Sequence, residues 1–113
     1  MNKQILIVKG SPRKNGNTAA MADSFAKGAY ESGNIITEIG LKDKIIGDCM
    51  GCGACQKQNG TCVQKDDMTE IYDAMKKADV IVLASPVYFY TWTSLMKRMV
   101  DRTFAVEPIL TNK

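Results

Sequence analysis

The stretch ILIVKGSPRKNGNT, residues 5–18, joins an apolar run to a segment of glycine, small polar and basic residues. Residues 5–9 lack the polar alternates of a half-exposed strand, which is typical of a strand buried on both faces of a parallel sheet. A helical repeat of apolar residues follows over 18–32, and Gly33 stands where a helix C-cap belongs. The stretch therefore predicts a strand, a loop and a helix, which together begin an α/β fold.

The same alternation continues along the chain. Two more strands are expected at 35–41 and 79–84, and two more helices at 67–78 and 94–104. The first of these strands has polar positions that suit a sheet edge, and Asp67 with Glu70 predicts an acidic capping box at the start of the following helix. The pattern predicts a doubly wound parallel sheet in a three-layer α/β/α architecture.

Each predicted helix carries an apolar stripe that we expect to face the sheet. The stripe residues are Met21, Ala22, Phe25, Ala26 and Ala29 in the first helix, Met68, Ile71, Tyr72, Met75 and Ala78 in the second, and Leu95, Met96, Met99, Val100 and Phe104 in the third. The charged residues of the third helix are expected on a solvated face with local ion pairs; they are Lys97, Arg98, Asp101 and Arg102.

Length and composition indicate one globular domain over residues 1–113. The chain is 45% hydrophobic and 24% charged, and its net charge of +3 is too small to predict nucleic-acid binding. No apolar run approaches the roughly 20 residues of a membrane span, and the N-terminus lacks the apolar core of a signal peptide. We therefore expect a cytoplasmic protein without a membrane or nucleic-acid partner, whose four cysteines are thiols or ligands rather than disulfides.

The loop after the first strand has the composition of an anion-binding loop. In parallel sheets ligands bind beyond the carboxyl ends of the strands, where the next helix presents unpaired N–H groups. The candidate phosphate ligands are Ser11, Arg13, Asn15, Gly16, Asn17 and Thr18. They offer hydroxyls, amides, a guanidinium and accessible backbone. Neither the G-x4-G-K-[ST] nor the G-x-G-x-x-G pattern is present, and an ordinary polar turn is the alternative.

A second loop, SPVYFYTWTS at 85–94, follows the last predicted strand. It contains Tyr88, Phe89, Tyr90 and Trp92, half of the eight aromatic residues of the chain. Exposed aromatic side chains at a strand end suit a planar ring system, whereas an aromatic core or a protein–protein surface is the alternative for this loop taken alone. The two loops together predict a ligand with a phosphate and a planar ring, and we expect a flavin.

The chain resembles the NADPH-dependent FMN reductase family of flavodoxin-like proteins in GSPRKNGNT after the first strand and in SPVYFYTWTSLMKRMVDR downstream. The resemblance covers nearly the whole chain. It implies that the first loop holds the FMN phosphate and that the isoalloxazine ring is held by Pro86, Val87, Tyr88 and Phe89. It also implies the strand order second, first, third, in a flavodoxin-like sheet that lacks the last strands of the usual fold. The apolar third strand would then lie at an edge, which predicts a homo-oligomer, a dimer or higher.

A cysteine-rich insertion is expected at 48–63, where the segment CMGCGACQKQNGTC contains Cys49, Cys52, Cys55 and Cys62. Four thiolates at this spacing can surround one [4Fe-4S] cluster, and the segment resembles the iron–sulfur flavoprotein branch of the same family. Three alternatives stay open: a zinc site, a redox-active set of thiols, and a loop that holds no metal.

These features predict an FMN-dependent oxidoreductase that passes electrons from a reduced donor through FMN to a small-molecule or protein acceptor. No catalytic side chain is expected, because the flavin carries the chemistry and the protein positions it. The resemblance implies NAD(P)H as the donor, and a ferredoxin-like donor is equally compatible with the iron–sulfur branch. The rival hypotheses are a ferredoxin-linked electron carrier with a [4Fe-4S] cluster and a truncated module that only binds metal or partners.

Overall fold

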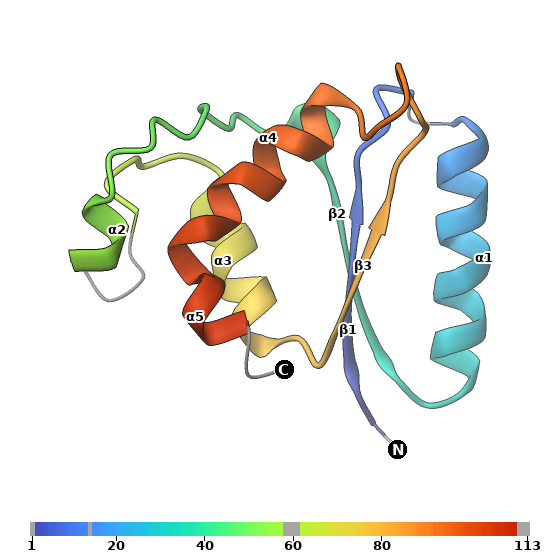
Figure 1. Ribbon diagram of the computed structural model, residues 1–113. Coiled ribbons are helices and arrows are strands. Elements are labelled where there is room, and N and C mark those ends of the chain that lie inside the picture. The colour runs from blue at the N-terminus through green and yellow to red at the C-terminus, as the bar shows by residue number, and fades with distance from the viewer. Residues whose placement is uncertain (1, 14, 58–61, 111–113) are drawn as a thin grey trace.

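Three parallel strands form one sheet in the described part of the chain. The computed structural model describes residues 2–13, 15–57 and 62–110. The strands are β1 (Gln4–Lys9), β2 (Ile35–Gly40) and β3 (Val80–Ala84), in the order β2-β1-β3 (Figure 1). Both pairings are parallel, and Leu6 lies between Thr37 and Ile81 in the register. The predicted parallel sheet and its strand order are confirmed.

Helices cover both faces of this sheet. The helices of the described part are α1 (Asn17–Glu31), α2 (Ala54–Lys57), α3 (Met68–Lys77), α4 (Ser94–Arg102) and α5 (Glu107–Leu110), with short 3₁₀ turns η1 (Leu41–Asp43) and η2 (Thr103–Val106). Helix α1 lies on one face, and α3 and α4 lie on the other (Figure 1). Gly33, at φ +90°, follows α1 as predicted. The three-layer α/β/α architecture is confirmed, and within the described ranges no helix is both long and apolar enough to cross a membrane.

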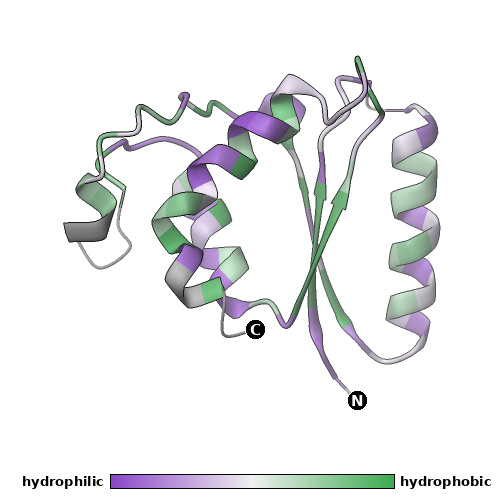
Figure 2. Ribbon diagram, in the orientation of Figure 1, coloured by the Kyte–Doolittle hydropathy of each residue, from purple (hydrophilic) through white to green (hydrophobic). Residues whose placement is uncertain are grey.

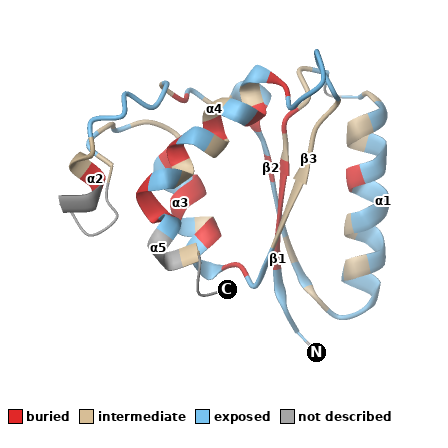
Figure 3. Ribbon diagram, viewed as in Figure 1, coloured by how far each residue is buried: buried red, intermediate tan, exposed pale blue. Residues whose placement is uncertain are grey.

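The central strand β1 contributes to two hydrophobic cores. Its residues Ile5, Leu6, Ile7 and Val8 are each at most 7% exposed. Successive side chains of a strand point to opposite faces, so Leu6 and Val8 pack with α3 and α4, whereas Ile5 and Ile7 pack with Ala22 of α1. The strands are largely apolar (Figure 2), and the buried residues gather on β1, α3 and α4 while α1 stays mostly exposed (Figure 3).

The apolar stripe of α1 is only partly buried. Ala22 is buried, but Met21 is 74% exposed and Phe25 is 46% exposed. The prediction that both large side chains face the core is therefore wrong. Both side chains line an open cavity together with Val82 and Trp92. This cavity lies beside β3, the edge strand of the described sheet, where no further strand covers them.

The last predicted helix ends two residues early. Helix α4 stops at Arg102, and its Met96 and Met99 are fully buried as predicted. The chain then tightens into η2, where Phe104 is 50% exposed. The prediction that Phe104 faces the core is wrong, because a 3₁₀ turn has a different residue spacing from the predicted α-helix.

A different acid from the predicted one caps α3. Asp66 Oδ1 accepts a hydrogen bond from the Met68 N–H at 3.0 Å. Asp67 Oδ2 instead accepts from the Ile45 N–H at 2.6 Å, and Glu70 pairs with a lysine of the preceding loop. The predicted capping box of Asp67 and Glu70 is therefore wrong. These contacts tie residues 44–45, just before the insertion, to the start of α3.

Candidate functional site

Two loops leave the carboxyl edge of the sheet side by side (Figure 1). They follow β1 and β3, whose last residues, Lys9 and Ala84, are paired in the register. The Gly10 N–H donates to the Ala84 carbonyl at 2.8 Å, and the Thr93 hydroxyl donates to the Gly10 carbonyl at 2.5 Å. The Thr93 N–H donates to the Ser85 hydroxyl at 3.2 Å. Direct hydrogen bonds thus hold the two loops together.

Gly10 permits the close approach between the first loop and α4. A Cβ atom at this position would lie 2.9 Å from the Met96 Cβ and 3.3 Å from the Thr93 Oγ1. Thr93 is the N-cap of α4, and its hydroxyl accepts the Met96 N–H at 3.2 Å. Any side chain at residue 10 must therefore push α4 away from the loop.

We predict that Gly10→Ala lowers the free energy of unfolding by about 1–3 kcal/mol, the usual cost of overpacking a tight contact. Urea unfolding measures the change. Gly40→Ala is the matched control, because a Cβ there meets no atom within 4 Å. Equal unfolding free energies for the two variants would contradict this account of the contact.

One cavity is lined by both loops. It measures about 300 Å³, and its lining residues are Ser11, Arg13, Gly16, Asn17, Thr18, Pro86 and Tyr88. We call it the two-loop cavity. The prediction that the two loops lie at neighbouring strand ends is confirmed. Three further candidate residues, Asn15, Val87 and Phe89, are exposed and do not line the cavity.

The first loop presents the start of α1 to this cavity. Gly16 precedes the helix without a side-chain cap, and the first turn contains no acidic residue. The Arg13 N–H donates to the Ser11 hydroxyl at 3.1 Å, which leaves the guanidinium of Arg13 outside that contact. Uncapped N–H groups and the positive end of the helix dipole favour an anion at this place.

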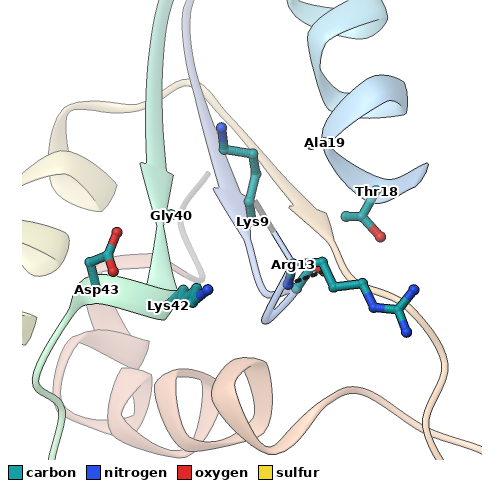
Figure 4. Close-up of a pocket in the computed structure, with 8 residues that line it drawn as sticks. Lys9, Arg13, Thr18, Ala19, Gly40, Lys42 and Asp43 are labelled. Carbon is teal, nitrogen blue, oxygen red and sulfur yellow. Dashed lines mark hydrogen bonds between the residues drawn. The ribbon is translucent and has the colours of Figure 1, made fainter. Parts of the chain in front are cut away.

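A second cavity of about 290 Å³ lies on the β2 side of the same loop (Figure 4). It shares Ser11, Arg13 and Thr18 with the two-loop cavity and adds Lys9, Ala19, Gly40, Lys42 and Asp43. Three of its lining residues are cationic, and Lys9 also lies 3.7 Å from Glu38 across the strand pair. The positive charge around the loop favours an anionic group there.

The aromatic loop contains a tight exposed turn. Tyr88 and Thr91 exchange backbone hydrogen bonds at 2.9 and 3.1 Å around Phe89 and Tyr90, whose φ angles are +45° and +72°. Their rings lie 5.4 Å apart in an edge-to-face pair, and they are 91% and 92% exposed. Positive φ is uncommon for such residues and costs free energy, so this turn holds the two rings out of the core.

The four cysteines line one small cavity at the far side of α4. Cys49 and Cys52 are exposed, Cys62 is half-buried and Cys55 is buried. All four line a cavity of about 30 Å³ together with Arg102, which we call the thiol cavity. No three His, Cys, Asp or Glu side chains within 2–13, 15–57 and 62–110 form a ready metal-binding group. Residues 58–61 of the predicted insertion at 48–63 lie outside the described part.

Arg102 is buried beside these cysteines, with 2% of its surface exposed. Its Nη1 donates to Asp66 Oδ2 at 2.7 Å and to the Gly47 carbonyl at 2.8 Å. Its Nη2 donates to Asp66 Oδ1 at 3.2 Å and lies 3.5 Å from the Cys62 sulfur. The predicted solvated face is wrong for Arg102, although Lys97 and Asp101 do form a local exposed pair.

Sequence reasoning missed Arg102 and its partner Asp66 as parts of this site. The available signal was spacing, because Arg102 follows Met96 and Met99 at three-residue intervals and so continues the apolar stripe of α4. An arginine on a buried stripe needs an acidic partner. That partner lies 36 positions earlier in the chain, where no local pattern points to it.

The Asp66–Arg102 pair alters the acidity of its surroundings. Burial acts to raise the pKa of Asp66, but hydrogen bonds from Arg102 and from the Gly47 and Met68 N–H groups outweigh it and hold that pKa below its usual range. Burial raises the pKa of Tyr72 to about 12, and its hydroxyl donates to the Arg102 carbonyl at 2.7 Å. Asp66 and Arg102 therefore stay charged and Tyr72 stays neutral at neutral pH.

This pKa makes stability depend on pH. A carboxyl group whose pKa is lowered by folding stabilises the folded state above its unfolded pKa of about 4, and the contribution is lost as pH falls through the lower folded value. We expect the free energy of unfolding of Asp66→Asn to fall less steeply below about pH 4 than that of the wild type. Urea unfolding between neutral and acid pH measures it, and an unchanged slope would contradict the assignment.

Related sequences support the family that the two loops indicate. The family of NADPH-dependent FMN reductases matches residues 4–113. An iron–sulfur flavoprotein of Archaeoglobus fulgidus is 41% identical over 84% of this chain and 43% of that protein. One of Methanocaldococcus jannaschii is 38% identical over 88% of this chain and 51% of that protein. The chain thus spans about half the length of these curated relatives.

Solved structures show the same fold. An NAD(P)H:quinone oxidoreductase from Methanothermobacter marburgensis superposes with a TM-score of 0.78 at 15% identity, over 92% of this chain and 54% of that one. At this identity the likeness concerns the fold alone, and it confirms the flavodoxin-like class. The chain belongs to the NADPH-dependent FMN reductase family, with iron–sulfur flavoproteins among its relatives, as its two loops and its cysteine segment predict.

Proposed function

We propose that the chain binds FMN in the two-loop cavity and acts as an FMN-dependent oxidoreductase. One observation carries the proposal: the predicted phosphate loop and the aromatic loop line the same cavity. The uncapped start of α1 and the surrounding cations suit a phosphate, and the aromatic loop suits a planar ring. Membership of the FMN reductase family supports the same cofactor.

Each loop has a separate task in this proposal. The phosphate would be held by Ser11, Arg13, Asn15, Gly16, Asn17 and Thr18. The ring would be held by Pro86, Val87, Tyr88 and Phe89. For Asn15, Val87 and Phe89 the assignment depends on the family resemblance, because these three do not line the cavity. The chain contributes binding, orientation and a positive local potential.

Bound FMN would supply two-electron exchange with a donor and one- or two-electron exchange with an acceptor. We propose NAD(P)H as the donor on the strength of the family, and a reduced ferredoxin-like protein as the alternative that the iron–sulfur relatives support. Neither donor needs a protein-derived base, which is consistent with a sequence that contains no histidine.

We further propose that Cys49, Cys52, Cys55 and Cys62 hold a [4Fe-4S] cluster. The donor set fits this group, because four thiols line one cavity and a buried cation beside them suits a negatively charged ligand set. A cluster takes one thiolate at each iron, so it needs four sulfurs around a space and not four around one ion. Such a group would supply one-electron transfer.

A second candidate function is a ferredoxin-linked electron carrier that uses the cluster. The thiol cavity favours this electron carrier, because all four cysteines line it and it shares no lining residue with the two-loop cavity. A cluster there would occupy a site of its own, apart from the proposed flavin site. A non-enzymatic module that only binds metal or partners is the third hypothesis. The three hypotheses differ in which of the two cofactors the protein requires.

The spectrum of anaerobically purified full-length protein tests these proposals. We expect flavin bands in the near ultraviolet and blue, a broad brown absorbance from a cluster, and bleaching of the flavin bands by NADPH, NADH or a reduced ferredoxin. Bleaching by the ferredoxin alone would favour the electron carrier. A colourless protein that FMN cannot reconstitute would contradict the oxidoreductase.

We also propose that the protein is a cytoplasmic homo-oligomer, as the sequence predicts. The apolar strand β3 lies at the edge of the described sheet, with Val80 36% exposed, and an exposed apolar edge pairs readily with further chain. Solution scattering on the full-length protein measures the assembly. A monodisperse monomer would contradict this part of the proposal.

A further inference from the structure

Arg102 brings a positive charge to the wall of the thiol cavity from inside the protein. Its side chain is 1% exposed, whereas the neighbouring arginine of α4, Arg98, is 38% exposed. Burying a guanidinium is costly unless it is paired and hydrogen-bonded. Asp66 and the Gly47 carbonyl supply three of those hydrogen bonds, so the cation is anchored in one orientation.

The two remaining N–H groups of this guanidinium, one on Nη2 and one on Nε, have no oxygen acceptor in the described part of the chain. Nη2 lies 3.5 Å from the Cys62 sulfur. Nε is buried and has no hydrogen-bond partner in the described part of the chain. A buried donor without a partner is unusual in a folded protein and calls for an explanation. Arg102 and Cys62 both line the thiol cavity, so an acceptor bound there could use these donors.

We propose that Arg102 is a positioning residue for the cluster, an inference that rests on the proposed [4Fe-4S] site. Its Nη2 holds the Cys62 sulfur at the cavity wall, and its charge and free Nε–H act on the sulfur ligands of the bound group. Hydrogen bonds to cluster sulfurs and solvent exposure help to set the reduction potential. N–H donors beside the sulfur ligands favour the more negative, reduced form, so Arg102 raises the potential, and its hydrogen bond to Cys62 slows loss of iron.

Asp66 fits this role as the anchor rather than as a ligand. Both of its oxygens accept from Arg102, and they also accept the Gly47 and Met68 N–H groups. The carboxylate is therefore fully engaged and directs the guanidinium between the insertion and α4. Tyr72 also holds the backbone of Arg102 in place, because its hydroxyl donates a hydrogen bond to the Arg102 carbonyl.

The test uses the full-length protein, purified without oxygen and reconstituted with ferrous iron and sulfide. The main variant is the pair Asp66→Asn with Arg102→Met, which removes both buried charges together and avoids an unpaired carboxylate. Arg98→Gln is the matched control, because Arg98 lies on the same helix as Arg102 but pairs with the exposed Asp48. Iron and sulfide per chain, iron release to a chelator, and an EPR-monitored redox titration are the readouts.

We expect the double variant to release iron several-fold faster and to show at least a tenfold smaller equilibrium constant for cluster reduction, about 59 mV for a one-electron couple. Arg98→Gln should match wild type. A double variant with the wild-type potential and iron-release rate would overturn the role of Arg102 and leave the cluster proposal intact. Wild-type protein without iron and sulfide would overturn the cluster and this inference together.

Arg102→Lys decides the question if the double variant is unfolded by circular dichroism. Lysine keeps the charge opposite Asp66 but has one nitrogen, so it cannot bridge Asp66 and Cys62 as the planar fork does. Faster iron release than wild type is expected from this variant. Wild-type release together with a wild-type potential would overturn the inference.

Discussion

Asp66→Ala should lower the free energy of unfolding by about 3–5 kcal/mol, because removing one partner of a buried ion pair leaves the other charge without compensation. Arg102 is the partner left behind, at 2% exposure. The substitution also removes the acceptor of the Gly47 and Met68 N–H groups, which loosens the start of α3 and the segment just before the insertion. Urea unfolding followed by circular dichroism measures the loss.

Asp48→Ala is the matched control for this prediction. Asp48 also pairs with an arginine of α4, since its Oδ1 lies 2.9 Å from Arg98 Nε, but its side chain is 84% exposed. Exposed ion pairs contribute about 0–1 kcal/mol, so this variant should unfold almost as wild type does. A loss for Asp66→Ala no larger than that for Asp48→Ala would contradict the buried pair as a main support of the fold.

Arg13→Ala should weaken FMN binding by roughly tenfold to a hundredfold, since a hydrogen bond to a charged group contributes about 1.5–3 kcal/mol. Arg13 lines the cavities on both sides of the first loop, and it is the one guanidinium in either lining. The same variant should leave the affinity for riboflavin, which has no phosphate, nearly unchanged. Isothermal titration of the apoprotein with both flavins measures the two effects.

Lys27→Ala is the control for charge alone. Lys27 is exposed on α1 and lines neither cavity, so its removal changes the net charge equally without touching the first loop. We expect FMN affinity close to that of wild type. If the two variants lose FMN affinity equally, or if Arg13→Ala weakens riboflavin as much as FMN, Arg13 is not a phosphate ligand.

The two loops could be predicted because local and topological rules agree on them. A strand without polar alternates, a loop with glycine and hydroxyl residues, and a helix start form a contiguous unit around 5–18. The aromatic loop follows another apolar strand, and the alternation of elements places both strands in one parallel sheet. Hydrogen bonds through Gly10 and Thr93 then bring the loops together as expected.

The rest required information that local patterns do not contain. Periodicity gives the direction of an apolar stripe, but it does not say how much sheet lies beneath it. The stripe therefore predicts burial of Met21 and Phe25, whereas the described sheet does not extend far enough to cover them. Charge suggested an exposed Arg102, although its spacing placed it on the buried stripe. Its pairing with Asp66 spans 36 residues and depends on tertiary structure.

Titration of the flavin-free protein with FMN and with riboflavin, followed by the fluorescence of Trp92, tests the central claim most directly. Trp92 is the single tryptophan, and it lies in the aromatic loop with 41% of its surface exposed. If the two loops jointly hold FMN, then FMN should quench it at one molecule per chain and bind at least about tenfold more tightly than riboflavin. Equal affinities for the two flavins, or no quenching by FMN, would contradict the account.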